Sequence, residues 1–381
     1  MKKKIGILTQ PLHDNYGGLF QAYALKEVLE SLGYDVVVIN RQIVTSEIRK
    51  KFSLLKSFLT GRKINKKALL SKNQSKYISK NTASFIKKFI PNLSPRITSK
   101  KQMNLLNSQG FYGYVVGSDQ SWRPKYSPDI YNYFLDFAEN QKNIKRITYA
   151  VSFGVSEWEF TEVETKKCRD LASKFDSISV REDSGVELVK NYFALNSTHV
   201  VDPTMLLSPD NYKKLIDNSQ SKFDGLKELN IYVLDKTLFK KDIIDYVKSR
   251  LNFESFEVLP KKNINDGKID SKNIDDFVFP HPLMWLTAFE KAKFVITDSF
   301  HGTVFSILNN VPFIAIGNQG RGLARFESLL RMFGLEDRLI TDFDKNKLDS
   351  IIYSDINWFR VNEKVSEERK KGIEYLKENL K

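Results

Sequence analysis

Short apolar runs alternate with amphipathic stretches along most of this chain of 381 residues. Apolar runs of about four to eight residues between polar turns are typical of buried strands, and apolar residues every three or four positions are typical of helices. The N-terminal region has a run at 4–9, an amphipathic stretch at 19–32 and a second run at 35–40. Gly33 stands where a helix commonly ends. This order predicts a mostly parallel sheet with helices on both faces.

The same alternation continues along the chain and predicts two α/β units. Strands of the first unit are expected at 113–116, 146–153, 177–180 and 199–201, and strands of the second at 230–234, 256–259, 294–297 and 312–316. A polar connection separates the two groups. We therefore expect an α/β fold with two Rossmann-like domains at 1–215 and 216–360, followed by a helix at 361–381.

The stretch 293–316 contains the strongest candidate for a functional turn. Its pattern predicts a buried strand, a polar turn, a helix at 302–308 and a second buried strand. Ligands of open α/β sheets bind where strands end and helices begin, and a helix N-terminus favours anions. His301 in this turn can hold a phosphate and exchange a proton with it. The alternative is that Asp298 or Ser299 merely caps the helix and that His301 is solvated.

Arginines also stand at positions that suit an anion site. Arg181 follows a predicted strand, and its planar guanidinium suits a carboxylate or a phosphate. The alternative for Arg181 is a salt bridge with Glu182 or Asp183 at the helix end. Arg321 and Arg325 flank the helix that follows the His301 unit, and they add positive charge to the cleft unless they are solvated. These groups favour a small ligand that bears phosphate and carboxylate.

Polar and aromatic residues follow the strand at 113–116. Asp119 and Gln120 stand at its carboxyl end, where Asp119 can orient or deprotonate a hydroxyl or can be an ordinary turn residue. Trp122 and Tyr126 come soon after and can form a surface on which a sugar stacks. Core packing is the alternative for both aromatic residues.

Composition excludes several classes of protein. The chain is 41% hydrophobic and 28% charged, which is typical of a globular protein with a large core. Cys168 is the sole cysteine, so an intrachain disulfide and a cysteine-rich metal site are excluded. The four histidines, His13, His199, His281 and His301, lack metal-ligand spacing, and we expect no metal. A glycine-rich dinucleotide fingerprint and a P-loop are absent, and the groups above do not suggest a serine or cysteine nucleophile.

The N-terminal residues are predicted to form the first strand instead of a signal peptide, because their apolar run is short. No apolar stretch has the length of a membrane-spanning helix. We therefore expect a cytoplasmic protein.

The positive charge of the chain is concentrated in one segment. Between Glu47 and Asp119 there is no acidic residue, and 16 Lys and Arg lie between Arg49 and Lys101. That number exceeds the net charge of +14, so the rest of the chain is close to neutral. This insertion at about 48–102 also has apolar residues at helical spacing, which suggests peripheral contact with a membrane surface through 49–101. The alternative is a solvated helical insertion, and nucleic acid is not expected as a partner.

Motifs spread along the chain are similar to those of the polysaccharide pyruvyl transferases. They are KIGILT at 4–9, NYGGLFQAYAL at 15–25, VVGSDQSW at 115–122, YFLDF at 133–137, ITYAVSFG at 147–154, SISVREDSGVELV at 177–189, VVDPTMLL at 200–207, ITDSFHGTVFSI at 296–307 and LLRMFGLEDRLI at 329–340. The order and spacing of these motifs together carry the resemblance. The basic insertion lies in the most variable part of the family pattern.

The resemblance implies a GT-B-like fold in which two domains face a cleft that holds the active site. It implies phosphoenolpyruvate as co-substrate, a cell-surface glycan or its lipid-linked precursor as acceptor, a pyruvate ketal and phosphate as products, and no cofactor. The expected catalytic residues are His301 and Arg181, the donor-binding residues are Ser299, Gly302, Thr303 and Arg325, and the acceptor-binding residues are Asn15, Asp119, Gln120 and Trp122. Some members carry a basic residue where this chain has Ser299.

Two other functions remain open at this point. One is a GT-B enzyme that uses a nucleotide sugar, and the other is a non-catalytic family member that binds a glycan.

Overall fold

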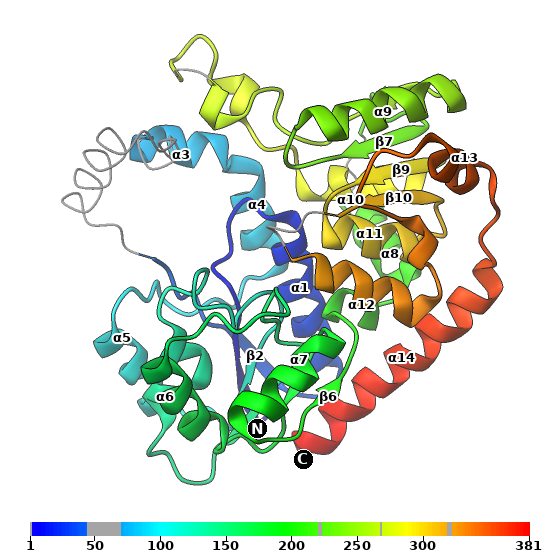
Figure 1. The fold of residues 1–381 in the computed structure, drawn as a ribbon. Helices are drawn as coiled ribbons and strands as arrows, with labels where there is room; N and C mark the ends of the chain where they lie inside the picture. Colours follow the sequence, from blue (N-terminus) through cyan, green and yellow to red (C-terminus); the bar gives the residue numbers. More distant parts are fainter. Residues whose placement is uncertain (1, 44–69, 220–222, 267–268, 318–321) are drawn as a thin grey trace.

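The computed structural model describes residues 2–43, 70–219, 223–266, 269–317 and 322–381, and it contains two parallel sheets (Figure 1). The strands of the N-terminal sheet lie in the order β2-β1-β3-β4. Their bounds are β1 (Lys4–Leu8), β2 (Asp35–Val38), β3 (Gly113–Val116) and β4 (Lys145–Thr148). A short parallel pair, β5 (Ser179–Val180) and β6 (Thr198–His199), continues this layer through bridges from Ile147 to Ser177 and from Val151 to Val180.

The C-terminal sheet has five parallel strands in the order β11-β10-β9-β7-β8. Their bounds are β7 (Leu229–Tyr232), β8 (Ser255–Phe256), β9 (Phe294–Thr297), β10 (Phe313–Ile316) and β11 (Leu339–Ile340). Every residue of β7, β9 and β10 is buried. Continuous burial explains why these strands are unbroken apolar runs in the sequence, since helices cover both faces of the sheet.

In both sheets the first strand lies between the second and the third. β1 pairs with β2 and β3, and β7 pairs with β8 and β9. The chain therefore crosses to the opposite face of each sheet at this point, and the loops on either side diverge into a crevice where ligands bind. The fold alone thus directs attention to the carboxyl ends of β1, β3, β7 and β9.

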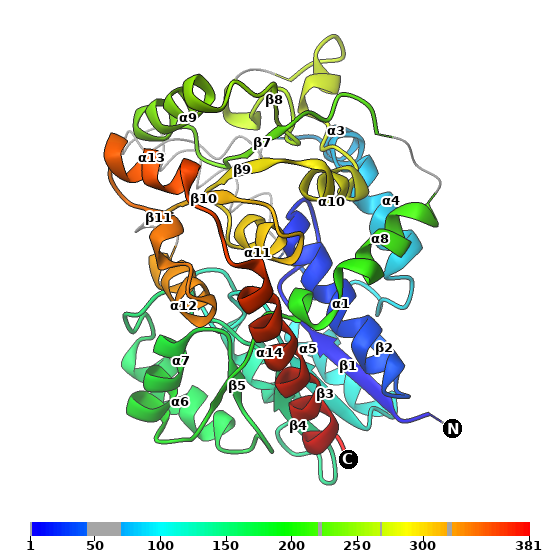
Figure 2. The ribbon, with the colours of Figure 1, turned by 90° about the vertical axis from the view of Figure 1, so that its right-hand side faces the viewer.

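Helices surround the two sheets, and α1 lies between them with most of its residues buried (Figures 1 and 2). The helix bounds are α1 (Tyr16–Ser31), α3 (Lys72–Ile78), α4 (Lys80–Phe89), α5 (Lys100–Asn104), α6 (Glu162–Ala172), α7 (Asp183–Leu188), α8 (Pro209–Asp217), α9 (Leu238–Leu251), α10 (Pro282–Lys291), α11 (Phe300–Leu308), α12 (Leu323–Phe333), α13 (Lys345–Tyr353) and α14 (Trp358–Asn379). None of the helices within the described ranges combines the length and the apolar character needed to cross a bilayer.

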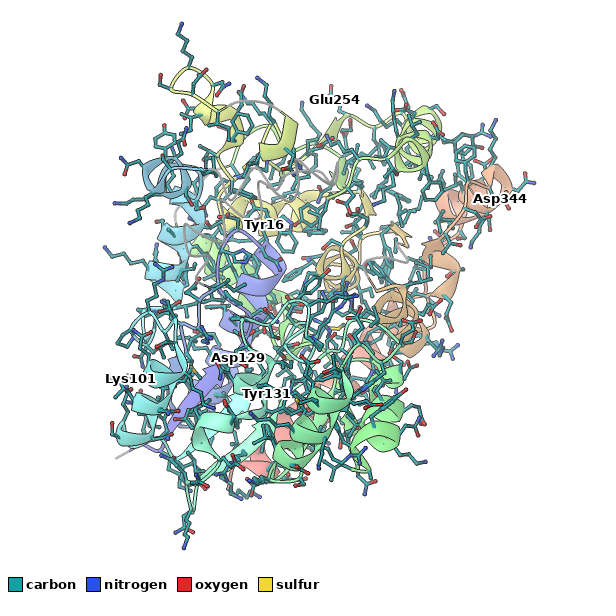
Figure 3. All side chains as sticks on the ribbon, turned by 60° about the vertical axis from the view of Figure 1, so that its left-hand side comes forward. Tyr16, Lys101, Asp129, Tyr131, Glu254 and Asp344 are labelled. Carbon is teal, nitrogen blue, oxygen red and sulfur yellow. The ribbon has the colours of Figure 1, made fainter. Side chains whose placement is uncertain are left out.

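Aromatic side chains join the two halves of the molecule. The Phe20 ring of α1 stacks on Trp285 of α10 and lies 5.7 Å, centroid to centroid, from Phe305 of α11. The Tyr16 hydroxyl donates a hydrogen bond to the carbonyl of Pro280 at 2.9 Å. Figure 3 labels Tyr16 at the end of α1 that meets the C-terminal half. Burial of these rings holds the facing edges of the two sheets together.

The final helix returns from the C-terminal half to the N-terminal half (Figure 2). Along α14, Arg369 donates to the carbonyl of Met205 at 2.9 Å. At its end, Tyr34 donates to the carbonyl of Leu380 at 2.7 Å. Gly372 allows close approach, because a Cβ there would lie 2.4 Å from the hydroxyl oxygen of Tyr149. This helix corresponds to the one predicted at 361–381, but it begins at Trp358. Its contacts pack it against the first domain.

The described part of the basic insertion, residues 70–101, packs on the protein. Phe85 of α4 is fully buried and lies against Phe20 of α1. Tyr77 of α3 donates to Asp275, and Asn81 donates to the carbonyl of Phe279, at 2.8 Å in each case. These helices thus bridge the two halves, and their apolar face is occupied by the protein itself. All eight Lys and Arg from 72 to 101 stay exposed, and residues 49–69 lie outside the described residues.

Several predicted bounds shift in the structure. β4 ends at Thr148, earlier than the predicted end of its strand, because the backbone turns at Ala150, which has a φ of 50°. Helix α11 begins at Phe300, two residues before the predicted start. The predicted domain boundary at 215/216 lies inside α8, whose Tyr212 ring contacts Phe305 of the C-terminal half.

Candidate active site

The turn after β9 is fixed by a buried carboxylate. Asp298 accepts hydrogen bonds from the backbone N–H groups of Leu234 at 2.7 Å and Asp235 at 3.2 Å. Lys240 of α9 forms an ion pair with the same carboxylate at 2.5 Å. Asp298 therefore joins the ends of β7 and β9, and its role is to hold the turn in place.

Ser299 caps helix α11. Its side chain accepts a hydrogen bond from the N–H of Gly302 at 3.3 Å, and its carbonyl accepts one from the Thr303 hydroxyl at 3.2 Å. Gly302 packs closely, because a Cβ there would lie 2.3 Å from Oγ1 of Thr297. The capping alternative thus holds for Ser299, and these three predicted donor-binding residues shape the N-terminus of the helix. The positive end of the helix dipole is directed at this corner.

His301 is buried in the first turn of α11, with 6% of the residue exposed, so the alternative of a solvated histidine is wrong. Its Nε2 lies 3.5 Å from Oδ2 of Asp202. Gly17 in the first turn of α1 covers the other side of the ring, and a Cβ at Gly17 would lie 2.1 Å from Nδ1. The imidazole is therefore held between an element of each half of the molecule.

Asp202 is the hub of the site. It is 1% exposed. Its Oδ1 accepts hydrogen bonds from the backbone N–H of Thr204 at 3.0 Å and from the Thr204 hydroxyl at 2.7 Å. Its Oδ2 accepts from Ser118 at 3.2 Å and from Arg181 Nη1 at 2.8 Å. Burial by itself raises the pKa of Asp202, but His301 and then Arg181 outweigh it and hold that pKa well below its usual range.

Arg181 lies among three carboxylates and is buried. Besides Asp202, its nitrogens reach Glu182 at 3.5 Å and Asp119 at 3.6 Å. Burial lowers the pKa of Arg181, but Glu182, Asp202 and Asp119 together raise it above its usual value. The predicted salt bridge between Arg181 and Glu182 is therefore present. The same guanidinium reaches the residues around His301.

Arg325 of α12 brings a second buried guanidinium to the cluster. Its Cζ lies 5.8 Å from the ring centroid of Phe300, and Cζ of Arg181 lies 4.3 Å from the same centroid. Burial, followed by repulsion from Arg181, lowers the pKa of Arg325 to about 10. Two cations held this close favour an anion between or beside them. Arg321 lies outside the described residues.

Asp119 and Gln120 lie at the carboxyl end of β3, as predicted. Asp119 has a φ of 63°, a left-handed conformation that is uncommon for a residue other than glycine, and it faces Arg181. The side-chain oxygen of Gln120 accepts a hydrogen bond from Arg123 at 2.9 Å. Asn15 is exposed at the N-cap of α1 and makes no capping hydrogen bond through its side chain. These residues border the site on its N-terminal side.

Trp122 lies in the core, which corrects the expectation that its ring binds an acceptor. The residue is 0% exposed, its indole N–H donates to the carbonyl of Tyr133 at 2.9 Å, and its ring stacks on Phe134 with centroids 4.4 Å apart. No face of the indole is left for a sugar. Tyr126 is exposed and covered on one side by the guanidinium of Arg123, 4.6 Å from its centroid.

Sequence reasoning did not assign Asp202 or Gly17 to the site. Asp202 follows β6 in a predicted strand-end position, but its partnership with His301 depends on the packing of the two halves. Gly17 is adjacent to Gly18 at the start of a helix, and only its proximity to His301 distinguishes the two glycines. Within the described ranges, no group of three or more His, Cys, Asp or Glu residues is placed to hold a metal ion.

The two Rossmann-like domains, with this cluster where they meet, define a GT-B-like fold. UGT89C1 of Arabidopsis thaliana, in its complex with UDP-L-rhamnose, is similar over 100% of both chains, with a TM-score of 0.52 and 9% sequence identity. UDP-GlcNAc 2-epimerase of Methanocaldococcus jannaschii is similar over 93% of both chains, with a TM-score of 0.50 and 11% identity. These similarities concern the fold alone.

Residues 15–320 match the family described as polysaccharide pyruvyl transferase. The chain therefore belongs to this family, as the motifs predicted. A stretch of 198 residues is also 23% identical to General stress protein 30 of Bacillus subtilis (strain 168). That match covers 49% of this chain and 54% of the relative, about half the length of each.

Proposed function

We propose that this protein transfers the pyruvyl group of phosphoenolpyruvate to two hydroxyls of a cell-surface glycan or its lipid-linked precursor. One observation carries the proposal: His301, at the junction of the two halves, shares the Asp202 carboxylate with the buried Arg181. A proton carrier and an anion-binding guanidinium thus converge on one point. Membership of the pyruvyl transferase family supports the reaction class.

The cationic groups suit the two acid functions of the donor. Arg181 and Arg325 lie over Phe300, and the N-terminus of α11 lies beside them. Guanidinium groups bind phosphate and carboxylate in a bidentate manner, and free N–H groups at a helix start bind phosphate. The carboxylates of Asp119, Glu182 and Asp202 balance Arg181 before the donor arrives. In this proposal the negative charge of the bound donor supplies part of the charge compensation near Arg325.

His301 is the proton donor in the proposed mechanism. Asp202 lies beside Nε2 and orients the ring, and the imidazole gives a proton to the methylene carbon of phosphoenolpyruvate. An oxocarbenium-like centre forms at C2, where one acceptor hydroxyl adds and returns a proton to His301. The second hydroxyl then replaces phosphate, which carries away the other proton. The products are a cyclic pyruvate ketal and inorganic phosphate. Asp119, beside Arg181, is placed to orient an acceptor hydroxyl.

A nucleotide-sugar donor is the main alternative, because proteins of similar fold bind UDP sugars. Thermal shifts with phosphoenolpyruvate and with a panel of nucleotide sugars separate the two functions. A ligand at 100 times its dissociation constant adds about 2.7 kcal/mol to the free energy of unfolding. We expect a shift with phosphoenolpyruvate that is smaller in Arg325→Gln. A shift with a nucleotide sugar alone contradicts the proposal.

Peripheral contact with an anionic membrane is a second part of the proposal, supported by the exposed Lys76, Lys80, Lys87 and Lys88. Each cation near such a surface contributes about 1 kcal/mol. Because α3 and α4 pack on both domains, deletion of the insertion is expected to disrupt the fold. The test is therefore the quadruple substitution of these lysines by Gln. We expect weaker co-sedimentation with anionic liposomes, and equal sedimentation of both proteins contradicts this part.

A further inference from the structure

An open cavity of about 700 Å³ lies at the carboxyl ends of β7 and β8, and the proposed donor site does not use it. Its lining includes Leu234 and Asp235 after β7, Glu257 after β8, the loop residues Lys261 and Asn263, and Phe279.

The cavity is adjacent to the turn that carries His301. β7 and β9 are neighbouring strands, and Tyr232 at the end of β7 pairs with Thr297 at the end of β9. Neighbouring strands lie about 4.8 Å apart. The backbone of Leu234 and Asp235, which forms one wall of the cavity, is bonded directly to Asp298, three residues before His301. One wall of the cavity is therefore joined to the turn that carries His301, although His301 itself does not line the cavity.

The size of the cavity exceeds the need of the donor. Phosphoenolpyruvate has a three-carbon skeleton, whereas cavities of about 300–1,000 Å³ hold ligands of drug size. A cavity of about 700 Å³ suits one or two sugar rings. A ligand larger than the donor, such as the second substrate, therefore fits it.

The lining carries the polar groups that a sugar needs. Asp235 and Glu257 are carboxylates, and Asn263 and Asn265 carry amides, so hydroxyl groups find both acceptors and donors there. Phe279 offers an apolar ring of the kind that packs on a sugar face. The loop after β7 has the sequence VLDKT, without the glycines that let a backbone cradle a diphosphate. Lys236, Lys261 and Lys262 also line the cavity, and Lys236 pairs with Glu257 at 2.8 Å.

The insertion fixes one side of this cavity. The N–H of Phe279 donates to the carbonyl of Ile78 at 3.1 Å, and its carbonyl accepts from Asn81 at 2.8 Å. Its ring also meets Tyr16 edge-on, with centroids 6.5 Å apart. Helices α3 and α4 thus position an aromatic wall that belongs to the C-terminal half, which gives the described part of the insertion a role in the site.

We propose that this cavity binds the sugar unit of the glycan acceptor and presents its hydroxyls to the His301 turn. The inference rests on the proposed function for the identity of the second substrate, but sugar binding is measurable without phosphoenolpyruvate. The specificity of the enzyme for its acceptor is then determined by Asp235, Glu257, Asn263 and Phe279.

The test is isothermal titration of the full-length protein with methyl glycosides of glucose, galactose, mannose and N-acetylglucosamine and with their β-linked disaccharides. We expect at least one to bind the wild-type protein. Glu257→Gln and Asn263→Ala, both on exposed residues, are expected to weaken that binding by about tenfold, the effect of losing a hydrogen bond worth about 1.4 kcal/mol. Phe279→Ala is expected to weaken it further.

Asn362→Ala and Glu363→Gln are the matched controls, because both residues are exposed on α14, away from the cavity. Their affinity for the saccharide is expected to equal that of the wild type. Absence of saccharide binding, equal affinity in the cavity variants, or displacement of the saccharide by uridine diphosphate overturns the inference. A separate assay of phosphate release from phosphoenolpyruvate tests the proposed function, so failure of one is distinguishable from failure of the other.

Discussion

The N-termini of α1 and α11 meet at the junction of the two domains but contribute different things. Each helix begins near the point where its sheet reverses strand order, and the two starts meet. At α11, Ser299 caps the helix and His301 supplies the reactive group. At α1, Asn15 makes no side-chain cap, and Gly17 supplies the space for the imidazole. In the proposed mechanism, one domain thus carries the proton donor and the other makes room for its ring.

Among the residues around His301, the largest combined change in stability and turnover is expected when the Asp202 carboxylate is removed. Asp202→Asn leaves Arg181 with less compensation for its buried charge, so we expect a loss of roughly 3 kcal/mol in the free energy of unfolding. Turnover is expected to fall by about 100-fold or more, because the ring loses its orientation. Steady-state kinetics and chemical denaturation at pH 7 measure both effects.

The pH dependence of that loss follows from the lowered pKa of Asp202. A folded pKa below the unfolded value of about 3.9 gives stability that is present above pH 4 and is lost as pH falls further. The stability difference between wild type and Asp202→Asn is therefore expected to be full at pH 7 and to shrink below about pH 4. A difference of the same size at pH 7 and pH 3 contradicts the assigned role of the carboxylate.

Alanine substitutions at the start of α1 distinguish the role of Gly17 from that of Gly18. At Gly17 a Cβ meets Nδ1 of His301 at 2.1 Å, so the imidazole must shift. A displacement of about 1 Å can cost about 100-fold in rate, and we expect a loss of that order in kcat. At Gly18 the nearest atom is 3.2 Å away, on the exposed Asn15 side chain, which can turn aside. Gly18→Ala is therefore the control, and equal kinetics of the two variants contradict the comparison.

A substitution of Arg325 tests whether this residue binds the donor. Arg325→Gln removes one of two guanidiniums near Phe300, and we expect the KM for phosphoenolpyruvate to rise by about tenfold. Because its pKa is lowered to about 10, wild-type donor affinity is expected to fall as pH rises through 10, and this step is absent in the variant. Arg331→Gln, on the exposed part of α12, is the control. A KM unchanged in Arg325→Gln excludes this residue from donor binding.

The smallest effect on activity is expected at Trp122. Trp122→Phe loses the hydrogen bond to Tyr133 and part of a packed core, at a cost of about 1–2 kcal/mol in the free energy of unfolding. The KM for the acceptor is expected to stay unchanged. An increased acceptor KM at unchanged stability would return Trp122 to the acceptor site.

The sequence predicts those parts of the fold that depend on local pattern. β9 and β3 have the predicted bounds, because unbroken apolar runs between polar turns can only be buried strands. The short β11 and the helix α13 were not predicted, since two strand residues and a polar helix surface produce little periodicity. The position of His301 at a strand end was predictable for the same local reason.

Contacts between distant segments could not be predicted in this way. Asp202 and His301 are 99 positions apart in the sequence, and their contact depends on how the two domains pack. A tryptophan side chain suits either a sugar-binding surface or a hydrophobic core, and the sequence does not distinguish the two. In the structure Trp122 is fully buried and belongs to the core. The sequence shows the apolar face of α4, but it does not show that this face packs on α1 and α10. The amphipathic pattern alone therefore suggested contact with a membrane.

The central claim is that His301 donates the proton that starts pyruvyl transfer. The most direct measurement is phosphate release from phosphoenolpyruvate, together with mass spectrometry of the acceptor, for the wild-type protein and for His301→Gln. The Arg181–Asp202 ion pair remains in that variant, so the fold is expected to persist. We predict ketal formation by the wild type and a loss of about 1,000-fold or more in the variant. Turnover retained by a folded His301→Gln protein contradicts the account.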